Sequence, residues 1–393
     1  MKKLGAIFQN QVEKTNEEDL IWVLNENGNI GIEIELENIR NTRMGRARTP
    51  NTPFNIGGVW KCVEDGSLRN RGAEFVSDVL WGKDLTDALK YLLEDYLPNR
   101  EQPVLSSRCS MHIHMDVRDL NILQLQRLLQ FYLIFEKVLF NYVGDRENNE
   151  YCIPYYSSVA GQLQLSKIMH PKSDINIMID KGVDEASIEW IESQFIKYMA
   201  LNLRPFCRAG SIEFRHSSAT LNMEAVKDWI NILYCLKKFA IEYDGETEPY
   251  ENFSVIGPYG FFREVFGEYA DKLDYPDIAS DLWEGCRVAQ DTYNLMALGQ
   301  VKVDYNKIIN GFINKFYKKD YKSKENKKSK PRLDIPTPEE NMDRLRHNYQ
   351  HINTYFVTNT EATTAGTFRN TADRNLENLE QQVRQYIEDD EVY

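Results

Sequence analysis

Alternating hydrophobic and polar positions mark several short segments of the chain as β-strands. Residues 30–38 contain GIEIELE, in which isoleucines and a leucine separate three glutamates. Because successive side chains of a strand point to opposite faces, this pattern predicts a strand with one apolar and one acidic face. Similar strand-like patterns occur in VWKCVEDGSL, GAEFVSDVL, CSMHIHMDV, KYMALNLRPF and SIEFRHSS.

Helical periodicity appears in longer segments between and after these strands. Residues 84–97 carry an apolar stripe with Asp84 as a candidate N-cap, and residues 119–143 are apolar around most of the helix, which predicts burial. Further helices are predicted at 222–243, 279–296, 304–317, 338–350 and 371–389. Residues 40–58 and 144–185 are predicted to be irregular because Gly, Pro and polar residues interrupt any period.

The order of these elements predicts an α+β fold in which an antiparallel sheet is backed by helices. Strands and helices do not alternate as regular βαβ units, and strands with one polar face are typical of antiparallel sheets. The predicted organisation is a lead-in over 1–29, a main domain over 30–245, a helical extension over 246–317, a Lys-rich linker over 318–337 and a charged helical segment over 338–393.

Charge and composition narrow the classes of protein to which the chain can belong. Its 393 residues have a formal net charge of −13 and a pI of about 5.1, which argues against broad nucleic-acid binding. The Lys-rich linker is the exception, although a solvated spacer is the simpler interpretation. The acidic C-terminal segment is interpreted as an oligomer contact, a partner-binding segment or a solubilising tail.

Hydropathy and cysteine spacing predict a cytoplasmic protein. No stretch reaches the roughly 18 apolar residues of a membrane span, and the N-terminal residues lack the apolar core of a secretory signal. The six cysteines are scattered without a CxxC pair, which favours free thiols in a reducing compartment.

Carboxylates at alternate positions of the first strand are the first candidate for chemistry. Glu33 and Glu35 would project side by side, roughly 7 Å apart, on one face of a strand. Their like charges would repel unless a cation lies between them, and a hard divalent ion such as Mg²⁺ takes carboxylate oxygens. The alternative is a solvated face of an edge strand.

Three other strands repeat the pattern with different side chains. His112 and His114 share a face in MHIHM, and Glu213 and Arg215 share one in SIEFR, while Glu74 lies in GAEFVS. Imidazole binds metals or phosphates, and guanidinium suits phosphate oxygens. Taken singly, one histidine could be an ordinary hydrogen-bonding residue, and Glu213 with Arg215 an ordinary ion pair.

The order ExE, E, HxH and ExR resembles the glutamine synthetase-like carboxylate–amine ligases, which include glutamate–cysteine ligase. The nearest resemblance is to the "putative amidoligase" branch, and it extends over about 31–245. The matching segments are GIEIE, EDGSL, GAEFVS, SMHIHMDV, KYMALNL and SIEFR, the last followed by ATLN and AVKDWI.

The resemblance implies a curved antiparallel sheet with ATP and Mg²⁺ ions over one face, Mn²⁺ being an alternative ion. It implies that Arg215 stabilises the transferring phosphoryl group, that His114 faces the nucleotide phosphates and that Asn202 contacts substrate. Glu37 has no counterpart and is predicted at the surface. The implied metal ligands, of which Glu33 is also catalytic, are Glu33, Glu35, Glu74, His112 and Glu213.

The implied reaction is ATP-dependent amide formation between a carboxylate and an amine through an acyl phosphate. Candidate substrates are amino acids, peptides, protein side chains or a modified base. The loop at 40–58, with Arg40, Arg43, Arg46 and Arg48, is a candidate cover for an acidic substrate or ATP, or an exposed loop. No GxxxxGK[ST] motif is present, which disfavours a P-loop ATPase. The rival interpretations are a metal-dependent hydrolase and a non-enzymatic binding protein.

Overall fold

The computed structural model describes residues 1–9, 29–46, 54–144, 146–170, 173–245 and 248–297. The helices predicted at 304–317, 338–350 and 371–389, the Lys-rich linker and Arg48 lie outside these residues. Everything stated about the structure refers to the described ranges.

A mostly antiparallel sheet of eight strands forms the centre of the protein. Its order is β2-β4-β5-β1-β6-β8-β7, with β3 paired to β4, and only the β2–β4 pair is parallel. The strands are β1 (Ile30–Leu36), β2 (Gly45–Arg46), β3 (Phe54–Ile56), β4 (Trp60–Glu64), β5 (Ala73–Ser77), β6 (Ser110–Asp116), β7 (Leu201–Asn202) and β8 (Ser211–Ser218). The predicted α+β fold is therefore confirmed.

The alternation in the sequence separates the two faces of this sheet. Ile32 pairs with Ile113, and Ile34 pairs with Phe75 and Met111, so apolar side chains align across three neighbouring strands. All of these side chains are completely buried. Burial of this face fixes the register, because a slip of one residue would turn every apolar side chain to the other side.

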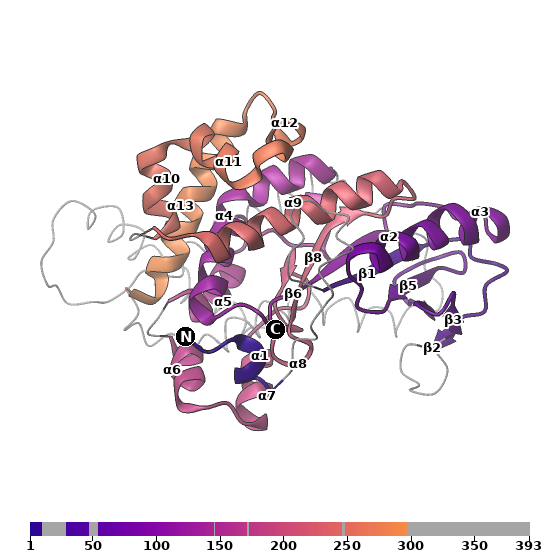
Figure 1. Cartoon of the computed structure of the whole chain (residues 1–393), viewed down its shortest axis with the longest axis horizontal. Helices are drawn as coiled ribbons and strands as arrows, with labels where there is room; N and C mark the ends of the chain where they lie inside the picture. Colours follow the sequence, from indigo (N-terminus) through magenta and orange to yellow (C-terminus); the bar gives the residue numbers. More distant parts are fainter. Residues whose placement is uncertain (10–28, 47–53, 145, 171–172, 246–247, 298–393) are drawn as a thin grey trace, which may run out of the picture.

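Two long helices cover the apolar face. Helix α4 (Ile122–Val143) begins at Asn121, whose side chain forms a capping box with Gln124, and α9 (Met223–Glu242) begins at Asn222. Figure 1 shows both helices running beside β6 and β8. Their aromatic side chains, including Tyr132 and Trp229, contact the back of β8. The apolar circumference of α4 thus reflects packing on several sides.

A helical group follows the sheet and packs against α4. It consists of α10 (Pro249–Ile256), α11 (Pro258–Phe266), a 3₁₀ turn (Gly267–Tyr269), α12 (Ala270–Leu273) and α13 (Ile278–Ala297), and Figure 1 shows it stacked at one end of the sheet. Gly285 of α13 lies so close to α4 that a Cβ there would meet the Ile134 carbonyl oxygen at 2.1 Å. Lys137 of α4 also pairs with Glu284 at 2.6 Å.

Three predictions about local structure are wrong. Residues 40–58, predicted to be irregular, contain the short strands β2 and β3, and the other two errors concern helices. Helix α2 (Gly82–Lys90) begins before Asp84, because Gly82 adopts a positive φ that lets the helix start directly after Trp81. Asp84 therefore lies in the first turn, where its charge favours the helix dipole. The helix continues as a π-helix (Tyr91–Tyr96) and α3 (Leu97–Arg100).

The region 144–185, predicted as irregular, is largely helical. It contains a 3₁₀ turn (Arg146–Asn148), α5 (Val159–Met169), α6 (Asp174–Lys181) and the start of α7 (Glu185–Ser193). Helix α5 is buried along its whole length although it contains polar residues, because those residues find partners: Gln164 accepts a hydrogen bond from the Ile196 amide, and Lys167 donates one to Gln194. Two short helices, α1 (Leu4–Ile7) and α8 (Phe206–Ala209), complete the described part.

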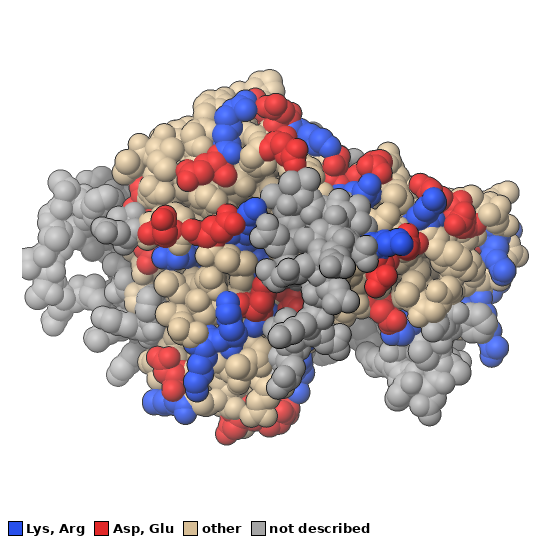
Figure 2. All heavy atoms as spheres, in the orientation of Figure 1, with Lys and Arg blue, Asp and Glu red and all other residues tan. Residues whose placement is uncertain are grey.

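The distribution of charged side chains on the surface and the state of the cysteines agree with what the sequence predicts. Figure 2 shows acidic and basic side chains interspersed over the visible face. Within the described ranges, every cysteine is a buried free thiol. Also within those ranges, no helix combines the length and apolar character needed to cross a membrane.

Candidate metal and phosphate site

Strand register brings the predicted residues together on the polar face of the sheet. Glu33 of β1 lies opposite His112 of β6, and Glu35 lies opposite Glu74 of β5. His114 of β6 lies opposite Glu213 of β8. Residues from four strands, far apart in the sequence, thus share one surface. The sheet achieves this because cross-strand partners point to the same side.

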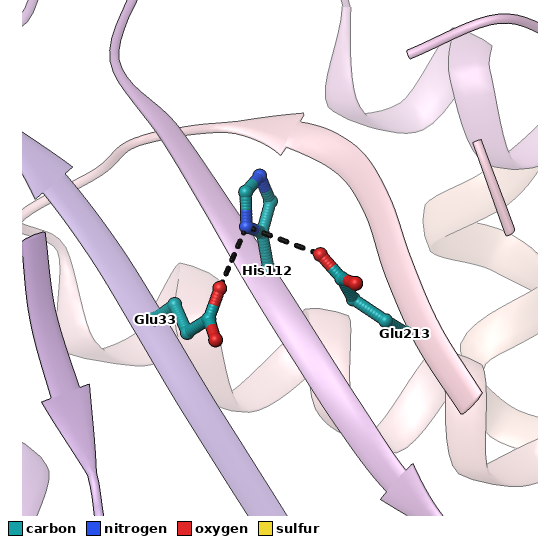
Figure 3. Close-up of side chains that lie close together, drawn as sticks. All are labelled: Glu33, His112 and Glu213. Carbon is teal, nitrogen blue, oxygen red and sulfur yellow. Dashed lines mark hydrogen bonds and ion pairs between the residues drawn. The ribbon is translucent and has the colours of Figure 1, made fainter. Parts of the chain in front are cut away.

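The first group of candidate ligands consists of Glu33, His112 and Glu213. The Nδ1 atom of His112 lies 3.0 Å from a carboxylate oxygen of Glu33 and 3.4 Å from one of Glu213 (Figure 3). One ligand atom from each of the three lies within 4.8 Å of the other two. His112 and Glu213 are buried, whereas the side chain of Glu33 is 24% exposed. The group can therefore be reached from the Glu33 side.

A second group, Glu35, Glu74 and His112, lies beside the first. Its ligand atoms also fall within 4.8 Å of one another, and His112 belongs to both groups. Ser110, two residues before His112 on β6, bridges them: its backbone amide donates to Glu35 at 2.9 Å, and its hydroxyl contacts both Glu35 and the His112 Nε2 atom. These bonds fix the His112 ring between the two groups.

The crowded carboxylates perturb one another. Burial, together with the charge of Glu33, raises the pKa of Glu74 to about 9. Burial acts in the same direction on Glu33, but hydrogen bonds and charges from His112 and His114 hold its pKa well below the usual range. Conversely, burial would lower the pKa of His114, but its contact with Glu33 raises it. The site therefore holds more acidic groups than its two imidazoles can neutralise.

Arg215 and Asn202 border the first group. The Arg215 guanidinium pairs with Glu213 and donates from Nε to the Tyr151 carbonyl oxygen at 3.2 Å. Asn202 of β7 donates to the other oxygen of Glu213 at 2.5 Å. Burial would lower the pKa of Arg215, but the charge of Glu213 raises it. Glu213 is thus oriented from two sides, and its pKa falls below the usual value against the effect of burial, mainly through Arg215.

A bulge on β8 affects how Arg215 is placed. Met111 pairs with Ser217 and Ile113 with Phe214, so β8 contributes one extra residue between these pairs. On the other side of β8, the Arg215 amide donates to the carbonyl oxygen of Ala200, just before β7, at 2.8 Å. Bulges of this kind bend a strand and redirect its side chains. Sequence alternation alone does not reveal such a shift.

One predicted position is wrong, and two contributing residues had not been predicted. Glu37 is buried, with 3% of its surface exposed, because its carboxylate accepts the Arg69 amide at 2.8 Å and its backbone pairs with Val104. Ser110 could have been noticed, since it shares the face of His112 and His114. Tyr151 could not, because it contributes only a backbone carbonyl from a distant loop.

The donor set suits a divalent cation. Four carboxylates and one imidazole offer mainly oxygen ligands, which Mg²⁺ prefers, and the imidazole of His112 is acceptable to Mn²⁺. The surplus of negative charge also favours a bound cation, because buried carboxylates that lie close together require either a cation or protonation. His114 extends the face beyond these groups, and its Nε2 atom lies 3.2 Å from Glu33.

Comparison with known proteins gives a family match and a distant structural likeness. The family described as "Putative amidoligase enzyme" matches residues 37–236. This range contains Glu74, His112, His114, Asn202, Glu213 and Arg215, whereas Glu33 and Glu35 precede it. No curated protein matches the chain.

One distant structural likeness, among others, is to a bifunctional glutathione synthetase from Pasteurella multocida, at 12% identity and a TM-score of 0.31. It covers 71% of this chain and 51% of that protein, so the chain spans about half of its length. A likeness at this level carries no argument about activity. The family match, in contrast, extends over half of the chain and over most of the strands that form the site. The chain belongs to the family described as "Putative amidoligase enzyme".

Proposed function

We propose that the protein is an ATP- and Mg²⁺-dependent ligase that joins a carboxylate to an amine through an acyl phosphate. One observation carries the proposal: Glu33, His112 and Glu213, from three strands, present ligand atoms within 4.8 Å of one another on the polar face of the sheet. Glu35 and Glu74 form a second such group through the shared His112. Two adjoining acidic groups suit a substrate that carries a polyphosphate with its bound metal ions.

Each side chain has a role that follows from its position. Glu33 and Glu213 would hold one ion with His112, and Glu35 and Glu74 would hold another. His114 lies beside Glu33, where it can contact the phosphates, and Asn202 orients Glu213. Bound ions supply charge neutralisation for phosphoryl transfer.

Arg215 is proposed to stabilise the transferring phosphoryl group. Arg215 is 7% exposed and its guanidinium pairs with Glu213, so this pair has to loosen before the guanidinium can reach a phosphate oxygen. Glu213 would hold Arg215 less strongly if its oxygens contacted a cation. The bond from Nε to the Tyr151 carbonyl oxygen would then keep the Arg215 side chain in place while its other nitrogens turned to the substrate.

The reaction requires no nucleophilic side chain. A substrate carboxylate oxygen attacks the γ-phosphorus of ATP, the bond to the β-phosphate oxygen breaks, and ADP leaves. The amine nitrogen then attacks the acyl carbon, phosphate leaves with the bonding electrons, and the nitrogen loses a proton. Phosphoryl transfer depends chiefly on positioning and charge stabilisation. A site built of carboxylates, imidazoles and one guanidinium provides these.

The proposal is tested by incubating the protein with ATP, Mg²⁺ and pools of amino acids and peptides. Phosphate release is measured together with mass spectrometry for a product formed by loss of water between two pool members. We expect phosphate release to require an acid, and a new amide to accumulate in proportion to it. A hydrolase using the same ligands would instead cleave pool members without ATP, which would overturn the proposal.

A further inference from the structure

A groove beside the candidate site carries a concentration of arginines that the catalytic roles above do not use. It has a volume of about 760 Å³ and is lined partly by Arg43, Arg69 and Arg71. Met44 and Leu68 add apolar surface, while Glu64 ends β4 and Asp65 begins the turn after it. Its size is within the range of sites that hold small organic ligands.

The groove adjoins the second metal group. Gly72, which lines the groove, precedes β5 and is two residues from Glu74, or about 7 Å along an extended chain. Asp65, also in the lining, lies close enough for its charge to act on Glu74. A ligand in the groove can therefore extend one end toward the ions proposed at Glu35 and Glu74.

Buried carboxylates hold both segments that present the arginines. Glu37, which is 3% exposed, accepts the Arg69 amide at 2.8 Å. Glu101, which is 5% exposed, accepts the amides of Arg40 and Asn41 at 2.7 and 2.8 Å and the Thr42 hydroxyl at 2.8 Å, just before Arg43. Each loop is thus tied to the fold by a carboxylate whose own charge faces inward.

The turn that carries Arg69 and Arg71 is also conformationally unusual. Asn70 and Arg71 both have positive φ, 51° and 60°, although neither is glycine. Such conformations cost about 1 kcal/mol or more each and tend to occur at functional sites. Bonds from the Asn38 and Ile39 amides to the carbonyls of Asn70 and Arg71 hold the turn in this shape.

The guanidinium groups of this turn are available to a ligand. Both Arg69 and Arg71 are exposed. Among the described residues, neither side chain has an ion-pair or hydrogen-bond partner. The three arginines of the lining outnumber its two carboxylates, Glu64 and Asp65, so the groove is locally positive in an otherwise acidic protein and suits an anion.

We propose that this groove binds an acidic peptide, whose carboxylates contact Arg43, Arg69 and Arg71 while one further carboxylate reaches the metal groups for activation. The proposal rests on the proposed ligase function for that last step. The openness of the surface and its apolar patches at Met44 and Leu68 suit an extended chain with several carboxylates.

Binding is tested with tri-glutamate and tri-glutamine, using calorimetry on the full chain without nucleotide or metal. We expect tri-glutamate to bind at least tenfold more tightly than tri-glutamine, with an affinity that falls as salt rises. The test variant is Arg69→Gln with Arg71→Asn, because Asn tolerates positive φ. It should weaken tri-glutamate binding at least tenfold.

The matched control is Arg263→Gln with Arg287→Asn, which removes two charges from exposed positions on α11 and α13. It should bind tri-glutamate like the wild type. If the test variant does not fold, Arg69→Gln alone, outside the strained pair, should still weaken binding severalfold. Equal binding of the two peptides, no binding of tri-glutamate to the wild type, or unchanged binding by the folded test variant overturns the proposal.

A second measurement separates the acidic peptide from the triphosphate of ATP as the source of negative charge. Stabilisation by Mg-ATP should be the same in the wild type and in the test variant. Loss of that stabilisation in the variant would assign the groove to the nucleotide and overturn the peptide proposal. Conversely, if the protein binds tri-glutamate tightly but never turns over ATP, the peptide-binding proposal for the groove holds and the proposed ligase function is wrong.

Discussion

The two faces of the sheet each carry a buried cluster of carboxylate and imidazole groups, and the clusters differ in how their hydrogen-bonding capacity is used. On the helix-covered face, Glu136 accepts the Tyr132 hydroxyl at 2.6 Å and the amides of Tyr155 and Tyr156 at 2.8 Å each. His216 lies 2.9 Å from the same Tyr132 hydroxyl. One carboxylate is thus matched by three donors.

On the polar face the balance is reversed. Glu33, Glu35, Glu74 and Glu213 share two histidines, one arginine and a few neutral donors. Among the residues that the structure describes, a backbone amide donates to Glu35, but most other oxygens of this cluster lack the backbone donors that satisfy Glu136. A carboxylate whose oxygens all accept hydrogen bonds from the backbone is typical of a structural role. Carboxylates that lack such donors and lie close together despite their mutual repulsion indicate a site for a ligand. Carboxylates and imidazoles are therefore expected to stabilise the fold on the helix-covered face and to bind a ligand on the polar face.

The largest expected effect is loss of activity when one carboxylate of the polar face is neutralised. Glu33→Gln should reduce ATP turnover at least 1,000-fold, or about 4 kcal/mol, because the amide is a poor ligand and cannot balance His112 and His114. Its melting temperature should remain near that of the wild type. Phosphate release and thermal unfolding measure the two effects.

The control for this change is Glu189→Gln, at an exposed position of α7. It should leave turnover unchanged. Full activity in Glu33→Gln would contradict the assignment of β1 to the site. The polar face would then no longer differ from the helix-covered face in function.

The corresponding change on the other face should act on stability. Glu136→Ala leaves two buried amides and a hydroxyl without their acceptor and creates a cavity. It should lower the free energy of unfolding by about 3 kcal/mol, measured by urea denaturation. Glu136→Gln keeps one acceptor oxygen and should cost less. A neutral effect of the alanine variant would show that the cluster is not structural.

Stabilisation by a divalent metal ion is expected only at the polar face, and it is slightly smaller than the loss of stability in Glu136→Ala. Mg²⁺ or Mn²⁺ at 100 times its Kd should stabilise the protein by about 2.7 kcal/mol, and EDTA should reverse the gain. Glu213→Gln should abolish this stabilisation. An equal response in the Glu213 variant would place the ion elsewhere, and the absence of any response in the wild type would argue against the site.

The smallest expected effect, counted per pH unit, is a dependence of stability on pH through His216. Burial, together with the charge of Arg146, lowers the pKa of His216 to about 3. Between its unfolded value near 6.5 and 3, the unfolded chain binds the extra proton, so the free energy of unfolding contributed by His216 falls as pH falls. Relative to His216→Gln, the wild type should lose about 1.4 kcal/mol per pH unit across this window.

Glu136 has the opposite sign, which is why the comparison with the variant is needed. Burial raises its pKa to about 7, so between 7 and about 4.5 the folded state binds the extra proton and the free energy of unfolding rises as pH falls. The two contributions offset one another in the wild type between about 4.5 and 6.5. Urea denaturation of both proteins at several pH values measures the difference, and parallel curves would contradict the burial of a neutral His216.

Local patterns were sufficient to predict the strands that carry the polar face and the charged residues on it, but not β2 and β3, which lie in a segment predicted to be irregular. The alternation in GIEIELE and MHIHM predicted β1 and β6, and the periodic apolar positions of 119–143 and 222–243 predicted α4 and α9. These predictions hold because one buried face imposes its period on the sequence. The helix α5 escaped prediction because buried Gln164 and Lys167 find partners that lie far away in the sequence.

The position of Glu37 shows the same limitation within the site. It continues the alternation of Glu33 and Glu35, yet it lies beyond the end of β1 and accepts the amide of Arg69 from the next turn. The sequence pattern is the same for a carboxylate that faces solvent and for one that accepts a hydrogen bond from a backbone amide. Only the fold of residues 65–72 brings the Arg69 amide to Glu37.

The sequence by itself determined which face of each strand is polar and which residues on it carry charge, because the pleat of a strand enforces a period of two. Tertiary structure decided which strands are neighbours, and hence that His112 lies between Glu33 and Glu213. It also decided that a bulge redirects β8 at Arg215 and that buried Glu37 and Glu101 hold the arginine loops. Contacts between distant segments depend on pairing and packing, which a local pattern does not encode.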